Sequence, residues 1–331
     1  MNEQPLVSVV MAVLNGGRLL KKSIESILEQ SYLNIQLVIV DDGSQDDTLD
    51  VIKSFSDERI KLLVNEQNMG LIYSLNYGVN NASGELIARM DADDIALPQR
   101  IAKQVNSFND DEHRVVVGSW LTLVNERECV TGEWQYPESN AAIKWNQLFN
   151  SGIAHPSVMF KKKAFLDSGG YSLNHKYAED YELWTRLGNK GQLYNIQESL
   201  VLYRVHDASI SQVSSVQQDL ARKKISKHNI KELLRSCHVE DETEILVDPY
   251  NSKDSSDLQI VINLRGHFQE IEKLNKSEIM HIDAYVVAMA MRLLTKSKFR
   301  EKVFILKLII ASTINLIDKC KFIVKFFIRL K

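Results

Sequence analysis

The sequence contains little cysteine. Its 331 residues include only Cys129, Cys237 and Cys320, which are widely spaced and odd in number. Because no C-x-x-C pair occurs, a disulfide framework and a zinc ribbon are both disfavoured. Neither of the glycine-rich phosphate loops, GxxxxGKS/T or GxGxxG, occurs near the acidic motifs of the chain. This absence argues against P-loop and dinucleotide-binding proteins.

Long hydrophobic runs are also missing. The longest uncharged apolar run covers residues 308–317, whereas a membrane-spanning helix needs roughly 18–20 residues. The apolar stretch at residues 7–14 has no basic segment before it, which predicts a buried strand rather than a signal peptide. We therefore expect a location in the cytoplasm or, as a peripheral protein, at the cytoplasmic face of the inner membrane.

Net charge is nearly absent, because 40 basic residues stand against 43 acidic ones, giving −3. This balance indicates no nucleic-acid partner. The charge is unevenly spread, however, and residues 296–331 hold ten basic and two acidic residues. On a helix five of these ten basic residues form one stripe on an apolar surface, as expected for contact with an anionic membrane. The alternative is a terminal helix packed on protein, with its charges solvated.

Strand and helix patterns alternate over the first 110 residues. Continuous apolar runs predict buried strands at 7–14, 37–40, 60–64 and 86–90. Helical spacing predicts helices at 19–30, 48–55 and 73–81, and another is expected to have Pro98 in its first turn. Repeated units of this length predict an α/β fold with a doubly wound, mostly parallel sheet flanked by helices.

The remainder of the chain is less regular and then helical. Strands are expected at 115–124 and 192–203, with helices at 141–149, 161–168 and 180–188. Beyond residue 213 we expect helices at 217–234 and 268–295, separated by a polar stretch at 237–257. The pattern predicts a first domain over residues 1–212 and a helical C-terminal region over 213–331.

Two acidic motifs follow predicted strands, and ligands of open α/β sheets bind at that edge. Asp91-x-Asp93 can hold a divalent cation and leave positions open for phosphate oxygens, unless it is an acidic surface turn. Asp41-Asp42-Gly43-Ser44 can accept the imide N–H of a uracil or a sugar hydroxyl. Its alternative is an Asx turn before the next helix.

Two further motifs lie late in the first domain. Glu179-Asp180 precedes a predicted helix, where one carboxylate could act as a general base; acids at a helix start are also common for electrostatic reasons. Tyr203-Arg204-Val205-His206 offers an arginine for phosphate oxygens and a histidine for a metal. The alternative there is a strand-end loop with a surface histidine.

Taken in order, the motifs resemble those of a known family. They are SVVMAVLNGG, VIVDDGSQDDT, Asn68-x-Gly70, MDADD with LPQR, HPSVMF, GGY, EDYELW and YRVH. Together they are similar to the family 2 glycosyltransferases, inverting enzymes with the GT-A fold. The resemblance covers roughly residues 5–210.

The resemblance implies a role for particular residues. The nucleotide sugar would be bound by Ala12, Leu14, Asp41, Asp42, Asn68, Asp91 and Arg204, within a nucleotide-binding part at about residues 1–110. Asp93 and His206 would hold Mn²⁺ or Mg²⁺, and Asp180 would be the general base. Glu179, His155 and Trp184 would contact the acceptor in the part at about 111–212, although His155 and Trp184 suit a core position equally well.

The function implied is transfer of a sugar from a nucleotide sugar, UDP-linked, to a glycan or lipid-linked oligosaccharide in cell-surface polysaccharide synthesis. One alternative is a sugar-phosphate nucleotidyltransferase, but Asn15-Gly16-Gly17-Arg18 is a poor version of the loop it would need. A second alternative is a catalytically silent nucleotide- or glycan-binding module at a membrane.

Overall fold

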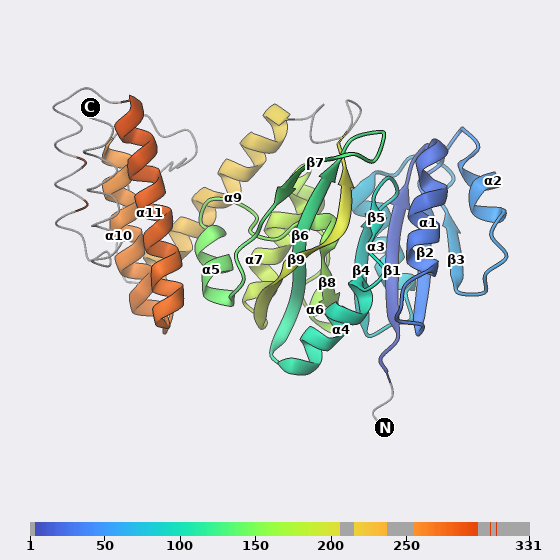
Figure 1. The fold of residues 1–331 in the computed structure, drawn as a ribbon, viewed down its shortest axis with the longest axis horizontal. Coiled ribbons are helices and arrows are strands. Elements are labelled where there is room, and N and C mark those ends of the chain that lie inside the picture. The colour runs from blue at the N-terminus through green and yellow to red at the C-terminus, as the bar shows by residue number, and fades with distance from the viewer. Residues whose placement is uncertain (1–3, 206–214, 237–254, 297–304, 306–308, 310–331) are drawn as a thin grey trace. The chain divides into compact units, whose positions relative to one another are not determined.

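A computed structural model describes residues 4–205, 215–236, 255–296, 305 and 309 (Figure 1). The chain forms two compact units, residues 1–143 with 151–221 and residues 144–150 with 222–331. Contacts therefore place the short segment 144–150 with the helical unit. The domain boundary expected at residue 212 stays a prediction.

The first unit contains a mixed sheet. Its strand order is β3-β2-β1-β4-β8-β6-β9-β5, with β7 paired to β6. Four strands form a parallel group: β1 (Val7–Val13), β2 (Ile35–Asp41), β3 (Ile60–Val64) and β4 (Leu86–Asp91). β6 (Arg114–Val124) and β9 (Gln192–Arg204) are parallel to each other, and β8 (Met159–Lys161) runs antiparallel to β4 and β6. The expected α/β, mostly parallel sheet is confirmed.

Helices flank this sheet. They are α1 (Leu20–Leu28), α2 (Thr48–Lys53), α3 (Leu71–Asn81), α4 (Arg100–Asp110), α5 (Asn140–Asn146), α6 (Lys162–Asp167) and α7 (Glu179–Gly188). Three short 3₁₀ turns add to them: η1 (Gly17–Leu19), η2 (His155–Ser157) and η3 (Leu173–His175).

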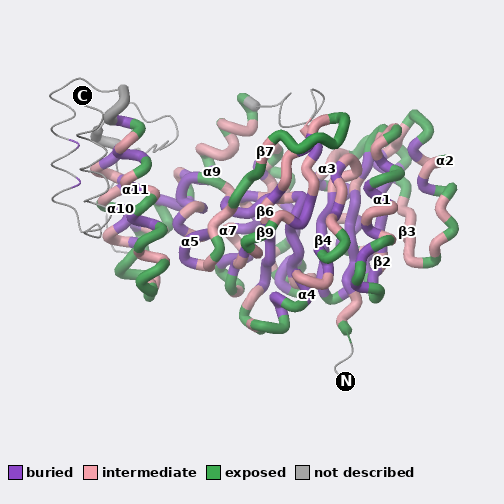
Figure 2. Tube along the Cα trace, viewed as in Figure 1, coloured by how far each residue is buried: buried purple, intermediate pink, exposed green. Residues whose placement is uncertain are grey.

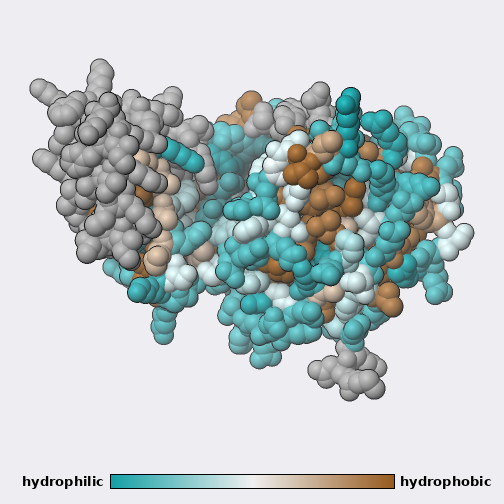
Figure 3. All heavy atoms as spheres, in the orientation of Figure 1, coloured by the Kyte–Doolittle hydropathy of each residue, from teal (hydrophilic) through white to brown (hydrophobic). Residues whose placement is uncertain are grey.

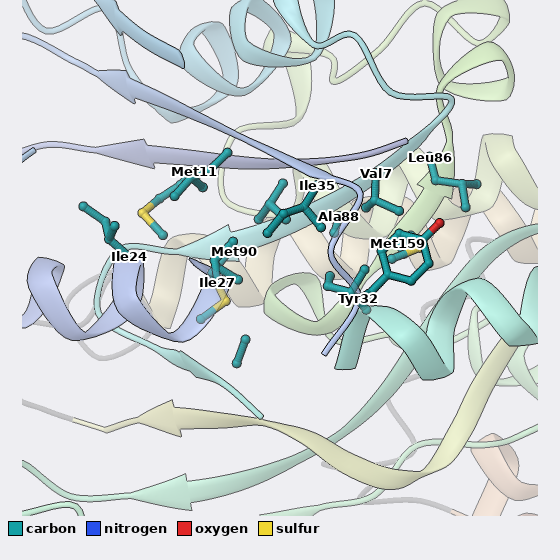
Figure 4. Packing of buried hydrophobic residues seen from close by; sticks show 14 of the residues in the cluster. Val7, Met11, Ile24, Ile27, Tyr32, Ile35, Leu86, Ala88, Met90 and Met159 are labelled. Carbon is teal, nitrogen blue, oxygen red and sulfur yellow. The ribbon is translucent and has the colours of Figure 1, made fainter. Parts of the chain in front are cut away.

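Burial on both faces of the sheet explains why its central strands are apolar throughout. Met11 belongs to the cluster packed against Ile24 of α1, as Figure 4 shows, whereas Val10 belongs to the cluster packed against Leu75 of α3. Successive side chains of a strand point to opposite faces, so both alternating sets must be apolar. The strands accordingly appear as buried tubes in Figure 2.

Three short strands were not expected from the sequence. β5 (Ile95–Ala96) and β8 have two and three residues, too few for a periodic signal. β7 (Val130–Trp134) is largely exposed and carries a glycine and a glutamate. The helix expected to have Pro98 in its first turn instead begins at Arg100, so that prediction was wrong by two residues.

The second unit is helical. It holds most of α9 (Ser215–Ser236), together with α10 (Ser255–Ile271) and α11 (Lys276–Lys296). Trp145 and Phe149 are buried with apolar residues of these helices, which explains why segment 144–150 belongs here. Arg265 Nε donates to Asp283 Oδ1 at 2.8 Å inside this core.

The region expected to be helical at 268–295 holds the end of α10 and most of α11, with a short break between them. Asn275 and Glu278 exchange hydrogen bonds between side chain and backbone N–H at 2.9 and 3.0 Å, which is a capping box that starts α11. Nothing among the helices of the described residues is long and apolar enough to cross a membrane. The basic stripe expected in 296–331 lies almost wholly outside the described residues, so its contact with a membrane stays a prediction.

Candidate active site

The ends of three parallel strands bring the first predicted residues together. In the sheet register Val13 lies opposite Asp41, and Ala12 lies opposite both Val40 and Asp91. The two acidic motifs and the end of β1 therefore share one edge of the sheet, as expected for strands of one direction. Leu14, just beyond β1, is exposed at this edge.

Asp42 is a buried anchor for the loop before α3. Its Oδ1 accepts hydrogen bonds from Asn65 Nδ2 at 2.7 Å and from the Met69 N–H at 2.9 Å. Its Oδ2 accepts from the Gly70 N–H at 2.9 Å. Gly70 begins α3 with φ of 91°, a conformation that favours glycine. Asn68, which is exposed, is thereby held beside the second acidic residue of the motif.

Asp41 uses its carboxylate differently. Its side chain is fully buried, and Oδ1 accepts only a long hydrogen bond of 3.3 Å from the Ser44 N–H. The Asx turn that was the alternative interpretation needs a bond two residues on, and before α2 it is Asp46 Oδ1 that accepts such a bond, from the Thr48 N–H at 3.1 Å. Within the part of the chain that the structure describes, Asp41 Oδ2 is buried without a hydrogen-bond partner. Asp41 Oδ2 can therefore still accept a hydrogen bond, whereas both carboxylate oxygens of Asp42 already accept one or more.

Asp91 is paired with an arginine that the sequence interpretation missed. Arg89 Nη1 donates to Asp91 Oδ2, and the Arg89 side chain is almost fully buried. The two residues are two apart on β4 and so lie on the same face. Burial raises the pKa of Asp91, as does the neighbouring Asp93, while the Arg89 charge opposes the shift. The sequence signal for this pair was an arginine two residues before the first aspartate of the acidic motif.

Arg204 holds the acidic turn through hydrogen bonds. Its backbone N–H donates to Asp94 Oδ1 at 2.9 Å, and its Nε donates to the Asp93 carbonyl at 3.0 Å. Nη2 reaches Glu128 Oε1 at 3.3 Å, and the side chain is only 1% exposed. Burial raises the pKa of Asp94 well above its usual value, and the charge of Asp91 adds to that shift.

Arg204 is buried beside the acidic turn. Its backbone N–H holds Asp94 and its guanidinium holds the Asp93 carbonyl. Its contact with a diphosphate stays a prediction. His206, the predicted metal ligand next to it, lies outside the described residues. Asp93 is half-buried on the turn itself.

The start of α7 supplies the predicted base. Burial raises the pKa of Asp180 to about 7, and the adjacent Glu179 charge adds to it. The Tyr181 N–H and Arg89 act in the opposite direction. Burial also raises the pKa of Glu179. A carboxylate with a pKa near neutrality is suited to general-base catalysis.

Arg89 connects this helix with the acidic turn. Its charge opposes the burial-driven rise in pKa of Asp91, Glu179, Asp180 and the Tyr171 phenol. We refer to Arg89, Asp91, Tyr171, Glu179 and Asp180 as the Arg89 cluster. Motifs separated by almost ninety residues in the sequence thus meet around one buried cation.

The two predicted acceptor residues with a core alternative differ in burial, because His155 is half-buried and Trp184 is fully buried. His155 Nε2 lies 2.8 Å from the Tyr171 hydroxyl, and burial lowers its pKa well below the usual value, which keeps the imidazole neutral. Trp184 is fully buried, with its ring against His155 and Phe160. An acceptor could contact the Trp184 ring only if this core opened.

The chain is similar to proteins of known family. The sequence model described as "Glycosyl transferase family 2" matches residues 8–169. An uncharacterized glycosyltransferase of Haemophilus influenzae is 36% identical over 241 residues, covering 70% of this chain and 75% of that protein. The O-antigen biosynthesis glycosyltransferase WbnJ of Escherichia coli is 34% identical over 242 residues, covering 70% and 89% respectively.

Solved structures with a similar fold include S. aureus TarS. Its fragment 1–349 in complex with UDP-GlcNAc gives a TM-score of 0.55 at 15% identity, covering 88% of this chain and 83% of that one. This chain covers 54% of another TarS structure. At this identity the likeness concerns the fold, which is of the GT-A type.

Proposed function

The chain belongs to glycosyltransferase family 2, and from this premise we propose that it is an inverting transferase acting on a UDP-sugar and a glycan. The observation that carries the proposal is Asp180, a half-buried carboxylate with a pKa of about 7 that shares Arg89 with the acidic turn. Because the base and the donor-binding turn lie beside the same arginine, they could act together in one sugar-transfer step.

The proposed step breaks one bond and forms one. Asp180 removes the proton from an acceptor hydroxyl as its oxygen attacks the anomeric carbon of the donor sugar. The bond from this carbon to the diphosphate oxygen breaks, and the nucleoside diphosphate leaves with the electron pair. Because the nucleophile enters opposite the leaving group, the anomeric configuration inverts. Asp180 then carries the proton.

The donor would bind at the strand ends. Asp41 has a buried oxygen open to an imide N–H, and Asp42 holds the loop that presents Asn68. Ala12 is small and Leu14 is apolar, so that edge leaves room for a base without offering it hydrogen-bonding side chains. The UDP-GlcNAc complex of the TarS fragment supports a UDP-linked donor on this fold.

The residues on the acidic turn fit a hard divalent cation. Asp93 offers carboxylate oxygens on a turn fixed by Arg204, with Asp91 beside it, and hard cations such as Mg²⁺ and Mn²⁺ prefer oxygen ligands. No group of three ligating side chains exists among the described residues, so phosphate oxygens would complete the shell. When bound, the cation would neutralise charge on the leaving diphosphate. Asp93 would be its main protein ligand, with His206 as the second candidate.

The acceptor is proposed to be a glycan or a lipid-linked glycan of a cell-surface polysaccharide. Its support is the similarity to WbnJ, whose name places that protein in O-antigen biosynthesis. A lipid-linked acceptor would also give the basic C-terminal stripe a purpose, at the cytoplasmic face of the inner membrane.

A donor panel tests the proposal. UDP-, GDP- and dTDP-sugars are incubated with the full chain, with and without Mn²⁺, and release of the nucleoside diphosphate is measured. We expect turnover with a UDP-sugar and its loss when the metal is chelated. Absence of turnover and of metal-dependent nucleotide binding across the panel would disprove the proposal. Release of pyrophosphate from a nucleoside triphosphate would instead support the nucleotidyltransferase alternative.

A further inference from the structure

An aromatic pair lies on β7 and β9 of the first unit, where Tyr203 directly precedes Arg204. Trp134, the last residue of β7, is 45% exposed, although tryptophan is usually among the more buried residues. Its ring lies 5.4 Å from that of Tyr203 on β9, at an interplanar angle of 31°. Exposed apolar side chains also gather near β6 and β7 in Figure 3. An exposed tryptophan in an apolar area indicates a binding surface.

The sheet register puts both rings on one face. Trp134 lies opposite Leu121 of β6, and Leu121 lies opposite Val201 of β9. Directly opposed residues share a face, and so do residues two apart on a strand, which brings Tyr203 to the same side as Val201. Both rings therefore lie on the same face of the sheet as the side chains of Leu121 and Val201.

That face leads to the predicted base. Tyr136 and Tyr203 both pack against a small cluster formed by Leu121, Ala154 and Val201. Asp180 and Tyr203 both act electrostatically on the phenol of Tyr136, so both lie near it. α7, which carries Asp180, packs on β6 and β9. A path of three aromatic side chains thus runs from Trp134 to the neighbourhood of the base.

We propose that Trp134 and Tyr203 form an acceptor subsite that binds a pyranose ring of the glycan by stacking, an inference that rests on the function proposed above. The faces of aromatic rings are electronegative, and the axial C–H bonds of a pyranose present a weakly positive apolar face to them. The donor would occupy the strand ends beyond β4, so the sugar on this pair belongs to the acceptor, one or more units from the reacting hydroxyl.

The test uses the full chain with p-nitrophenyl mono-, di- and trisaccharide glycosides as acceptor probes. Trp134→Ala should raise the acceptor KM about tenfold or more, with kcat and the donor KM within about twofold of wild type. Tyr203→Phe keeps the ring and should leave the acceptor KM within about twofold, whereas Tyr203→Ala should raise it.

A matched control comes from a second exposed aromatic pair. Tyr73 is 40% exposed and lies 6.1 Å from Tyr77 on α3. Tyr73→Ala removes a similar apolar area and should leave the acceptor KM unchanged. Circular dichroism and thermal midpoints would verify that the variants fold. If Trp134→Ala folds and has the wild-type acceptor KM, or raises the donor KM equally, the subsite does not exist.

Direct binding separates this inference from the proposed function. Saturation-transfer NMR of the same glycosides needs no turnover, and it should show binding to wild type that is lost in Trp134→Ala. If wild type turns over no nucleotide sugar but still binds glycosides through Trp134, the proposed reaction fails and the subsite stands. If wild type binds none of the glycosides, the subsite is disproved, whatever the outcome of the donor panel.

Discussion

The carboxylates at the end of β2 and those of the Arg89 cluster differ in their surroundings: Asp41 and Asp42 are buried, whereas Asp91, Glu179 and Asp180 are half-buried. Asp42 receives three hydrogen bonds, from one amide and two backbone N–H groups. Asp180 lies beside the like charge of Glu179, which destabilises its charged form. One carboxylate orders a loop, whereas the other is held ready to take a proton.

This difference indicates which acids do chemistry and which build the site. A carboxylate that accepts several N–H hydrogen bonds, as Asp42 does, orders the backbone that supplies them. A carboxylate with a pKa near 7, such as Asp180, has a destabilised charged form and can accept a proton near neutral pH, as is common at active sites. The following variants test this contrast through the activity of Asp180 variants and the stability of Asp42 variants.

The largest effect is expected for Asp180→Asn. The amide has nearly the same size but cannot remove the acceptor proton, so transfer should fall by about a thousandfold, the centre of the range of general-base contributions. UDP affinity, measured by calorimetry, should remain within about threefold. Asp167→Asn, an exposed acid paired with Lys163 on α6, is the matched control and should transfer normally.

Normal transfer by Asp180→Asn would show that the base is another group, with Glu179 as the next candidate. The Glu179→Gln variant would then have to lose activity. If both variants transferred normally, the Arg89 cluster would have no catalytic function and the contrast with Asp42 would be one of burial alone.

Stability should respond most at Asp42. In Asp42→Asn one oxygen becomes an amide nitrogen, which leaves the N–H of Met69 or Gly70 unpaired and removes the charge that strengthens the other bonds. A loss of about 1–3 kcal/mol is expected, measured as a lower urea midpoint of tryptophan fluorescence. Asp41→Asn, where one long hydrogen bond is at stake, should cost less. Equal losses would remove the distinction between the two neighbours.

Much of this arrangement could be predicted from the sequence, because local rules determine it. The parallel strands of the first 91 residues follow from continuous apolar runs, and both acidic turns had to fall at their ends. Trp184 was harder to place. Its position in EDYELW reads equally well as a site residue or as the buried side of a helix, and only tertiary packing decides.

Arg89 shows what local patterns leave out. Its role depends on Asp180 and Tyr171, which approach it through the fold rather than through sequence spacing. The different roles of Asp41 and Asp42 were equally hidden, since the Met69 N–H more than twenty residues later reaches Asp42, whereas Asp41 accepts from the nearby Ser44 N–H. Short-range motifs identified the acids but not their partners.

Arg89→Gln tests the cluster through its pH dependence. The cation lowers the pKa of Asp180 against the effect of burial, so its removal should move that pKa upward from about 7. Transfer by wild type should rise with pH through about 7, as Asp180 loses its proton, and the rise in Arg89→Gln should occur at higher pH. At pH 7 we expect a loss of about tenfold, partly recovered at pH 9.

The control for Arg89→Gln is Arg59→Gln, which breaks another Arg–Asp pair, with Asp57 at 2.8 Å. Arg59 directly precedes β3, which lies at the opposite end of the strand order from β6 and β9, the strands on which α7 packs. Its pH–rate profile should coincide with that of wild type. A pH profile of Arg89→Gln with an unshifted midpoint would mean that Arg89 only holds Asp91, and that the acidic turn and the base are electrostatically independent.

The smallest effect is the most direct test of the contrast, because it predicts a gain. The pKa of Asp180 is about 7 in the folded chain and about 4 when unfolded. The unfolded state therefore loses the proton first, and stability from this group is present below about pH 4 and is lost as pH rises through about 7. Asp180→Asn removes that loss, so its thermal midpoint should exceed that of wild type by a few degrees (about 2–4 °C per kcal/mol) at pH 8, and by less at pH 5. Asp167→Asn should show no such gain. A midpoint of Asp180→Asn below that of wild type at pH 8 would mean that its charge stabilises the fold, as at Asp42, and that the two carboxylates do not differ in kind.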